Sequence, residues 1–236
     1  MNPTSRPSPT RLALLERLAD LIATLRRPHP VRVAVDGVDA AGKTTLADEL
    51  AALLAARGRA VIRAGIDGFG RSRADRYRRG ELSAEGYYQD GFDYPALRAD
   101  LLEPLGPGGS RRYRTATFDV RTDQPRAAPL LLAAPDAVLV VDGVFLLRPE
   151  LNDAWDLRVF LEVGFQETLR RAVARDRALF GSAQTTRARY QRRYIPGQRR
   201  YLATAQPQRI ADVVIDNHDP TTPKLITSRL DQPAQP

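Results

Sequence analysis

The sequence predicts an α/β protein in which helices cover both faces of a mainly parallel β-sheet. Short apolar runs alternate along the chain with segments of helical periodicity. The apolar runs are continuous rather than alternating, as expected for strands that are buried on both faces. A glycine-rich loop joins the first of these runs to the helix that follows, and 236 residues suffice for one large domain with an insertion.

The composition limits the chemistry that the protein can use. The chain has no cysteine, which excludes disulfides, thiolate zinc sites and cysteine nucleophiles. Its two histidines, His29 and His218, lie beside prolines and aspartates near expected ends of elements. We therefore expect any general base to be a carboxylate.

The net charge of +8 allows several interpretations. It fits a site for anionic small molecules, attraction to nucleic acid or a membrane surface, or compositional bias alone. Because the basic residues are spread along the chain, we do not expect a nucleic-acid partner. No stretch approaches the roughly 20 apolar residues of a membrane span, and residues 1–10 lack a secretory apolar core. We expect a cytoplasmic protein without membrane association; a homo-oligomer stays open.

Residues 1–30 are expected to form a disordered lead-in and an amphipathic helix. Within residues 12–25, one helical face collects Leu14, Leu15, Leu18, Leu21, Ile22 and Leu25. We expect this face to pack on the domain. The alternative is a helix that lies on a lipid surface. Few basic residues flank this helix, which disfavours the alternative. The sequence "RPHP" then ends the helix.

The main domain is expected over residues 31–217. Strands are predicted at 31–36, 59–67, 136–143, 156–163 and 211–217, and helices at 43–58 and 165–176. Between residues 67 and 135 the pattern loosens, which indicates an insertion at the strand tips with a short helix at 95–105 and a strand or hairpin at 111–120. Residues 218–236 are polar and contain prolines, so we expect a partly ordered tail.

The loop after the first strand reads "GVDAAGKT" and matches the pattern G-x-x-x-x-G-K-[ST]. In such a loop, successive backbone N–H groups and the positive end of the helix bind phosphate oxygens. The lysine reaches the terminal phosphates, and the threonine hydroxyl binds Mg²⁺. A guanidinium is bulkier and planar, which explains a lysine in this arginine-rich chain. The predicted phosphate-binding residues are Gly37, Val38, Asp39, Ala40, Ala41, Gly42, Lys43, Thr44 and Thr45.

Further motifs follow the loop in order: "IDGF", "GYYQDGFDYP", "VVDGVF", "RRAVARD" and "ADVVIDN". With the loop, they make residues 31–217 resemble the uridine kinase and phosphoribulokinase family of P-loop kinases. The resemblance implies a three-layer P-loop NTPase sandwich with an acceptor-binding insertion and a lid over residues 178–197. It also implies transfer of the γ-phosphoryl group of ATP, with Mg²⁺, to a hydroxyl of a small molecule.

Three aspartates are expected where strands of the sheet end. Asp67 follows the second strand, and the resemblance implies that it acts as base toward the accepting hydroxyl; a simple turn with Gly68 is the alternative. Asp142 ends an apolar run and is expected to hold Mg²⁺ with Thr44, or else to be a solvated strand terminus. Asp36 ends the first strand and is expected to assist the acceptor or the metal.

The acceptor is expected to bind in the insertion. The segment "FDYP" resembles a family segment whose aspartate binds ribose hydroxyls, which assigns that role to Asp93. The resemblance also places Tyr88 and Arg121 at the acceptor. The aromatic residues near Asp93 would either stack on a base or pack the insertion.

On the nucleotide side, Arg171 and Arg175 are four residues apart and share a helix face. The resemblance implies that Arg175 neutralises charge on the transferred group, and that Arg171 and Asn217 contact the nucleotide. A solvated helix face is the alternative. The later stretch "RARYQRRYIPGQRRYL" is expected to be a packed helix rather than a surface for single-stranded nucleic acid.

The acceptor itself stays open. Gly70 follows Phe69, and Asp119 and Val120 precede Arg121, where uridine kinases have aromatic or histidine residues. A uridine- or cytidine-like nucleoside is the first hypothesis; pantothenate, ribosylnicotinamide, a sugar phosphate or another polyol are alternatives. A P-loop regulatory protein without kinase activity is a further alternative, although the base-reading motif of a GTPase is absent.

Overall fold

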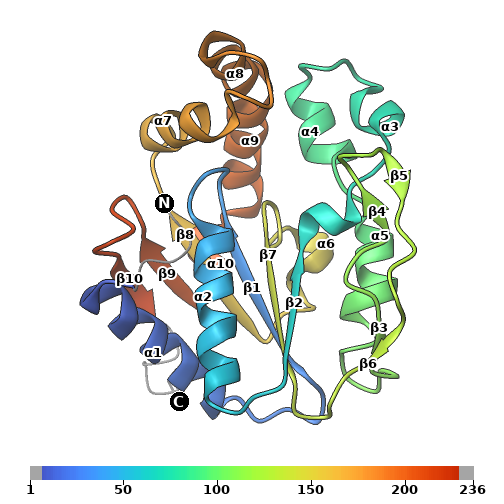
Figure 1. Cartoon of the computed structure of the whole chain (residues 1–236), viewed down its shortest axis with the longest axis vertical. Coiled ribbons are helices and arrows are strands. Elements are labelled where there is room, and N and C mark those ends of the chain that lie inside the picture. The colour runs from blue at the N-terminus through green and yellow to red at the C-terminus, as the bar shows by residue number, and fades with distance from the viewer. Residues whose placement is uncertain (1–6, 229–236) are drawn as a thin grey trace.

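The computed structural model describes residues 7–228 and contains a six-stranded sheet in the order β10-β9-β8-β1-β7-β2 (Figure 1). Five strands run parallel, and β10 is antiparallel to β9. The bounds are β1 Val31–Gly37, β2 Val61–Gly65, β7 Val138–Gly143, β8 Leu157–Glu162, β9 Val213–Asp216 and β10 Lys224–Ser228. The prediction of a mainly parallel α/β sheet is confirmed.

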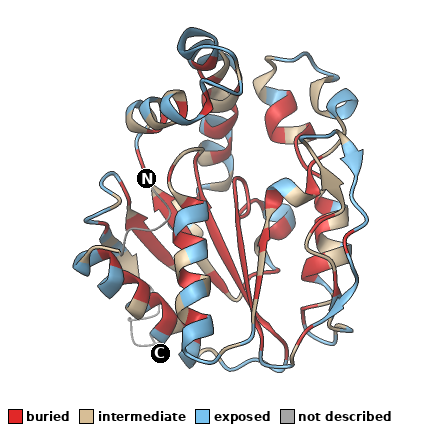
Figure 2. Cartoon of the chain, viewed as in Figure 1, coloured by how far each residue is buried: buried red, intermediate tan, exposed pale blue. Residues whose placement is uncertain are grey.

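The sheet has helices on both faces because its strands are apolar on both sides. Helices α1 (Pro9–Thr24) and α2 (Lys43–Ala56) cover one face. Leu18 of α1 and Leu50 of α2 pack there with Val33 and Val140. The buried side of α1 is the predicted apolar face, so this helix packs on the domain (Figure 2).

The opposite face of the sheet supports the C-terminal helices and the insertion. Ala34, Val141 and Phe160 alternate with the residues above and pack with Tyr201 of α9 (Ile195–Ala205). The short helices α6 (Pro149–Asn152) and α10 (Pro207–Ile210) lie on the same side. These three layers match the predicted sandwich.

The insertion begins directly after β2. Its elements are a 3₁₀ turn at Ile66–Phe69, α3 Arg73–Tyr77, α4 Ala84–Asp90, α5 Tyr94–Leu97, a π-helical turn at Arg98–Leu102, and the two-residue strands β3 Arg112–Tyr113, β4 Phe118–Asp119, β5 Gln124–Pro125 and β6 Leu131–Leu132. The 3₁₀ turn shortens the second strand, which was predicted to reach residue 67. Asp67 therefore projects from a turn beyond the strand.

On the other side of the carboxyl end of the sheet stand α7 (Phe165–Asp176), α8 (Ala183–Arg189) and a π-helical turn at Tyr190–Tyr194 that leads into α9 (Figure 1). The helix predicted at 165–176 is found with the same bounds. The expected lid, residues 178–197, comprises α8 and this turn.

The region after β9 differs from the expectation. The polar segment 218–236 was expected to be a partly ordered tail, yet Lys224–Ser228 forms the edge strand β10. Lys224 pairs with Asp216, and Ser228 pairs with Val213. An edge strand needs only one partner and little apolar surface, so its short pattern gives a weak signal in the sequence. Residues 1–6 and 229–236, which hold most of the expected lead-in and the rest of the tail, lie outside the described residues.

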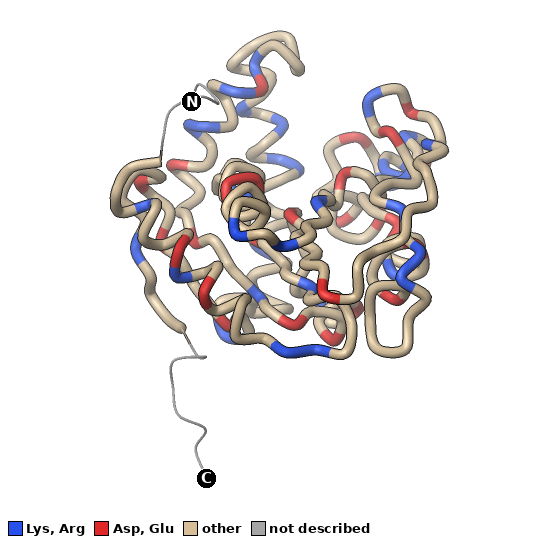
Figure 3. The backbone as a smooth tube through the Cα atoms, turned by 60° about the horizontal axis from the view of Figure 1, so that its bottom comes forward, with Lys and Arg blue, Asp and Glu red and all other residues tan. Residues whose placement is uncertain are grey.

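Within residues 7–228, the helices are too short or too polar for any of them to cross a membrane. Figure 3 shows basic and acidic residues interspersed along the backbone rather than collected in one stripe.

Candidate active site

The strand order brings the predicted site residues together. In the sheet, β7 lies between β1 and β2, with Asp36 opposite Gly143 and Gly65 opposite Asp142. All three strands run in the same direction, so their carboxyl ends meet at one edge. The phosphate loop follows β1 there, and the turn with Asp67 follows β2. Open α/β sheets bind ligands at such an edge.

The phosphate loop Gly37–Thr44 has the backbone that a tight cradle requires. Gly42 has φ +97°, and a Cβ at this position would lie 2.6 Å from Nδ2 of Asn217. Ala40 also has a positive φ, of 58°. The ammonium of Lys43 is buried and donates to the carbonyl oxygen of Val38 at 2.8 Å. Lys43 thus lies folded over the loop that it is expected to complete.

Thr44 and Asp142 offer oxygen atoms next to the loop. The Thr44 hydroxyl donates to Oδ2 of Asp142 at 2.6 Å. A hydroxyl and a carboxylate are ligands that suit Mg²⁺, which also keeps water and phosphate oxygens in its shell. The residues present therefore fit the expected metal. Sequence reasoning missed Arg63 on β2, whose Nη2 lies 2.7 Å from the other oxygen of Asp142.

Asp67 lies close enough to the phosphate loop and to Arg175 of α7 for their charges to act on it. Its side chain is accessible to solvent. Although Asp67 can be reached by solvent, the protein atoms crowded around its carboxyl group desolvate it and raise its pKa. The charges of Asp39 and Asp142 raise this pKa further, and Lys43 and Arg175 oppose them. No residue within the described range donates a hydrogen bond to this carboxylate. Its oxygens are available to a hydroxyl of a bound molecule.

Asp36 does not reach a ligand. It is completely buried, and its oxygens accept from the backbone N–H of Gly37 at 2.6 Å, from that of Leu147 at 3.1 Å and from the Tyr201 hydroxyl. Burial raises the pKa of Asp36 to about 6, although these hydrogen bonds and Lys43 favour its charged form. The prediction that Asp36 binds substrate is therefore wrong. The residue ties the strand below the phosphate loop to α9.

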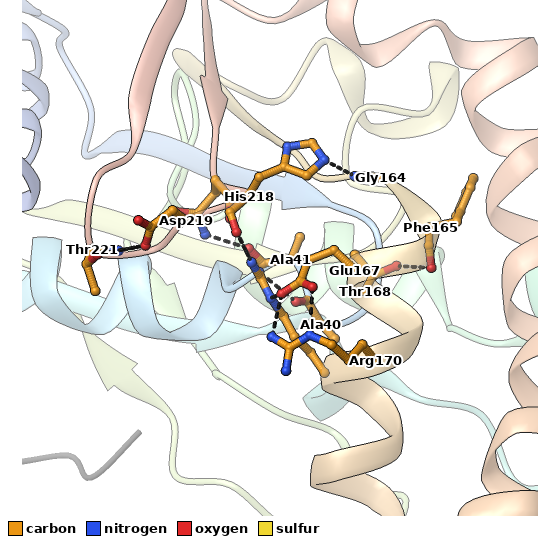
Figure 4. A network of polar contacts seen from close by, with 12 residues as sticks. Ala40, Ala41, Gly164, Phe165, Glu167, Thr168, Arg170, His218, Asp219 and Thr221 are labelled. Atoms are coloured by element: carbon orange, nitrogen blue, oxygen red, sulfur yellow. Dashed lines mark hydrogen bonds and ion pairs between the residues drawn. The ribbon is translucent and has the colours of Figure 1, made fainter.

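Asn217 and Arg171 support the phosphate loop from outside. Figure 4 shows the polar network beside Ala40 and Ala41 of the loop, with Glu167 and His218 close by. The buried Asn217 amide donates to the carbonyl oxygen of Ala41 at 2.6 Å. Arg171 donates to the carbonyl oxygens of Ala40, Asn217 and His218 at 3.4, 3.1 and 2.7 Å, and pairs with Glu167. These contacts hold the backbone of the loop; whether the two side chains also touch a nucleotide stays a prediction.

Asp93 and Arg121 lie beside the turn that carries Asp67. The backbone N–H of Asp93 donates to the carbonyl oxygen of Phe69 at 2.7 Å, and Oδ1 of Asp93 caps α5 through the N–H of Ala96 at 3.0 Å. Arg121 is exposed in the turn between β4 and β5, and β4 packs against the 3₁₀ turn. Their binding to an acceptor stays a prediction.

Tyr88 points away from the phosphate loop. It is buried, and its hydroxyl lies 3.3 Å from Oγ1 of Thr204 on the far part of α9. The structure thus contradicts its expected place at the acceptor. Successive residues of a helix point about 100° apart, and it is Tyr87 whose hydroxyl reaches the loop, at 3.0 Å from Oδ2 of Asp39.

No family model matches the chain. Among solved structures, it is similar to a protein from Bacillus stearothermophilus named as a possible uridine kinase, with a TM-score of 0.68 and 23% identity over 86% of this chain and 97% of that one. A protein from Silicibacter sp. TM1040 that carries the name of a fructose transport system kinase also has a TM-score of 0.68, with 26% identity over 82% of this chain and 94% of the other. This chain has the uridine kinase-like P-loop kinase fold.

In this P-loop kinase fold, Arg175 stands on α7 near the phosphate loop. It forms a two-point pair with Asp176, at 2.6 and 3.0 Å, and donates to the Tyr190 hydroxyl at 3.2 Å. The bonds to Asp176 raise the pKa of Arg175. Its guanidinium is therefore charged and held in place, while its side chain is 59% exposed.

Sequence reasoning missed Gln198 and Tyr201 on α9. Gln198 contacts Asp39 in the phosphate loop, and Tyr201 contacts Asp36 below it. The two residues are three apart and share a helix face. The spacing of tyrosines in this segment predicted a packed helix face; Tyr190 and Tyr201 are buried, and Tyr194 is half-buried.

Proposed function

We propose that this protein transfers the γ-phosphoryl group of ATP to a hydroxyl group of a small molecule. The position of Asp67 carries the proposal. This carboxylate is free of protein donors within the described residues, and it interacts electrostatically with Lys43 of the phosphate loop and with Arg175. A kinase needs such a carboxylate where an accepting hydroxyl meets the terminal phosphate.

The residues of the loop would act mainly by position and charge. The backbone N–H groups of residues 37–44 and the Lys43 ammonium bind the phosphates, which requires Lys43 to leave the carbonyl of Val38. Thr44 and Asp142 would hold Mg²⁺, which neutralises phosphate charge when bound. Arg175 would stabilise charge on the transferred group.

Asp67 would orient the acceptor and take its proton. As the acceptor oxygen bonds to the γ-phosphorus, the bond from that phosphorus to the bridging oxygen of ADP breaks, and the hydroxyl proton passes to Asp67. The raised pKa of Asp67 makes it a stronger base than an ordinary aspartate. It must be ionised at the start of the reaction.

Two features restrict the acceptor. Tyr87, Tyr88 and Tyr94 are buried in the core, so these three residues of the insertion do not offer a face for stacking on a base. Both similar proteins are named for compounds with sugar hydroxyls. We therefore infer an acceptor held mainly through hydroxyl groups; a uridine- or cytidine-like nucleoside would bind through its ribose.

The test is an acceptor screen that measures ADP release with ATP and Mg²⁺. Nucleosides, free sugars, pantothenate, ribosylnicotinamide and sugar phosphates form the panel. We expect one class to raise ADP release, with a phosphorylated product found by mass spectrometry, and Lys43→Ala to abolish the increase. Equal ADP release with and without every acceptor would instead support a nucleotide-dependent regulatory protein.

A further inference from the structure

The phosphate loop contains a carboxylate, Asp39, that it does not need for binding phosphate. Oδ2 of Asp39 accepts from the Tyr87 hydroxyl at 3.0 Å and from Nε2 of Gln198 at 2.6 Å. The backbone N–H of Asp39 donates to Oε1 of Gln198 at 3.3 Å. Tyr87 belongs to α4 in the insertion, and Gln198 belongs to α9. The side chain of Asp39 is thus turned toward these helices.

Asp39 is held in one orientation. Tyr87 and Gln198 are both buried, and the side chain of Tyr87 packs edge-on against Phe145 and Tyr194 with ring centroids 5.1 and 4.9 Å apart. Because packing holds the Tyr87 hydroxyl in place, the hydrogen bond from this hydroxyl also holds the carboxylate of Asp39 in one orientation. The remaining oxygen, Oδ1, has no donor within residues 7–228, and Asp39 forms no ion pair there.

The charge of Asp39 acts on the residues assigned to phosphoryl transfer. After burial, Asp39 is the main cause of the raised pKa of Asp67. It also adds to the raised pKa of Arg175, for which the bond to Asp176 is the larger cause. Asp39 is therefore close enough to Asp67 and to Arg175 of α7 to act on the charge of both, and its side chain contacts α4 of the insertion.

A carboxylate at this place repels the phosphates of the nucleotide, which is a cost for a loop that binds them. The same carboxylate suits a hydroxyl, because an ionised carboxylate only accepts hydrogen bonds and a hydroxyl can donate one. Asp67 supplies one such acceptor for the hydroxyl that is phosphorylated. Oδ1 of Asp39 supplies a second one nearby.

We propose that Asp39 is a specificity-determining residue that binds a second hydroxyl of the phosphoryl acceptor. This inference rests on the proposed kinase function and names its substrate class: an uncharged compound with at least two hydroxyl groups, such as a free sugar or a ribonucleoside. The carboxylates of Asp39 and Asp67 would repel a phosphate or carboxylate group of the acceptor placed between them. Phosphorylated sugars and simple alcohols are therefore poor acceptors.

The first test is the ranking of acceptors by kcat/KM. The probes are D-fructose, D-ribose and uridine, the anions ribulose 5-phosphate and pantothenate, and 1-propanol. An uncharged compound with several hydroxyls is expected to rank first, and its analogue lacking one hydroxyl near the reacting one is expected to lose at least about tenfold. If an anion or 1-propanol ranks first, the inference fails while the kinase function stands. If no compound is phosphorylated, the kinase function itself fails and the inference with it.

The second test removes the charge of Asp39. Asp39→Asn keeps the size of the side chain and an oxygen for Tyr87 and Gln198, so the loop is expected to stay in place. The KM for the acceptor should rise about tenfold or more, because a hydrogen bond to a charged group is lost. The KM for ATP should stay equal or fall, because a negative charge near the phosphates is removed. An unchanged acceptor KM would overturn the proposal.

Two adjacent tyrosines provide a matched pair that does not alter the loop sequence. Tyr87→Phe removes a donor from Asp39, and Tyr88→Phe removes a hydroxyl that contacts Thr204 instead. Both residues are buried, so the two substitutions should disturb the packing of the core to a similar extent. Tyr87→Phe should raise the acceptor KM several-fold, and Tyr88→Phe should leave it unchanged. Equal effects of the two would mean that the tyrosines act only through packing.

Discussion

Arg63 on β2 and Asp142 on β7 form an ion pair across neighbouring strands, with Nη2 of Arg63 2.7 Å from Oδ1 of Asp142. The other oxygen of Asp142 accepts from Thr44. One carboxylate is therefore shared between a guanidinium and the threonine of the phosphate loop. Because a bound cation and a guanidinium compete for the same negative charge, this pair should weaken Mg²⁺ binding.

Replacing Arg63 should tighten the binding of Mg²⁺, so that less metal is needed for activity. In Arg63→Gln, the charge of Asp142 is no longer shared, so half-maximal activity should need several-fold less Mg²⁺, in line with the modest energy of a partly exposed pair. A Mg²⁺ titration at saturating ATP measures this. Arg57→Gln, whose arginine pairs with Glu16 and Asp20 on the surface, is the control and should not shift the titration. A weaker Mg²⁺ response in Arg63→Gln would mean that Arg63 positions Asp142 for the metal.

Asp67→Asn should fold and bind ATP but lose most of its turnover. Removing a general base costs roughly 10²- to 10⁴-fold in rate. Single-turnover kinetics and calorimetry of nucleotide binding separate the two effects. Turnover close to that of the wild-type protein would remove Asp67 from the reaction.

The same residue should shape the pH profile. Because burial raises the pKa of Asp67, the base becomes protonated at a higher pH than an ordinary aspartate. Turnover should therefore fall on acidification through that raised pKa and recover above it. The residual activity of Asp67→Asn should lack this acid limb, and persistence of the limb in the variant would assign it to another group.

Asp36 should make the protein less stable as the pH rises. The pKa of Asp36 is about 6 in the folded state and 3.8 as a reference value, so the folded state binds the proton more tightly. Its stabilising effect is complete below the reference pKa and is lost as the pH rises to about 6. The difference amounts to ~3 kcal/mol in the free energy of unfolding.

Urea unfolding at several pH values between 4 and 7 measures this effect. Other carboxylates titrate in the same range, so the quantity to compare is the wild-type protein against Asp36→Asn, which keeps the size of the side chain. The variant should lack the fall in stability between pH 4 and 6. Parallel curves for the two proteins would show that Asp36 does not titrate in this window.

Asn217→Ala should weaken nucleotide binding by about tenfold. The Asn217 amide is the donor to the carbonyl oxygen of Ala41, and its loss leaves a carbonyl of the cradle without this partner. Titration of the protein with ATP measures the change in affinity.

Gly42→Ala should weaken the binding of ATP more severely, because the new methyl group meets the Asn217 amide. The double variant Gly42→Ala with Asn217→Ala should recover only part of the affinity for ATP, because the positive φ of residue 42 remains. Full recovery of the affinity for ATP in the double variant would mean that the clash with Asn217, rather than the positive φ of residue 42, causes the loss.

The layers of the fold and the phosphate loop could be predicted from the amino-acid sequence. Apolar runs such as 138–141 and the periodic faces of α1 and α7 are local patterns, and a local pattern predicts an element wherever it packs. The loop is similarly contained in eight consecutive residues. Asp67 and Asp142 could be placed at one edge of the sheet because parallel strands end there together; their roles stay predictions.

Which side chains face the site depends on how distant segments pack in the folded chain. Tyr87 rather than Tyr88 reaches Asp39, because the orientation of α4 about its own axis is set by packing against Phe145 and Tyr194. Arg63 and Gln198 carry no motif, and they approach Asp142 and Asp39 only after the chain has folded over long distances in sequence. Asp36 is buried because α9 packs over the end of its strand. Contacts with residues so distant in the sequence leave no signal in the segment around Asp36, so its burial could not be predicted.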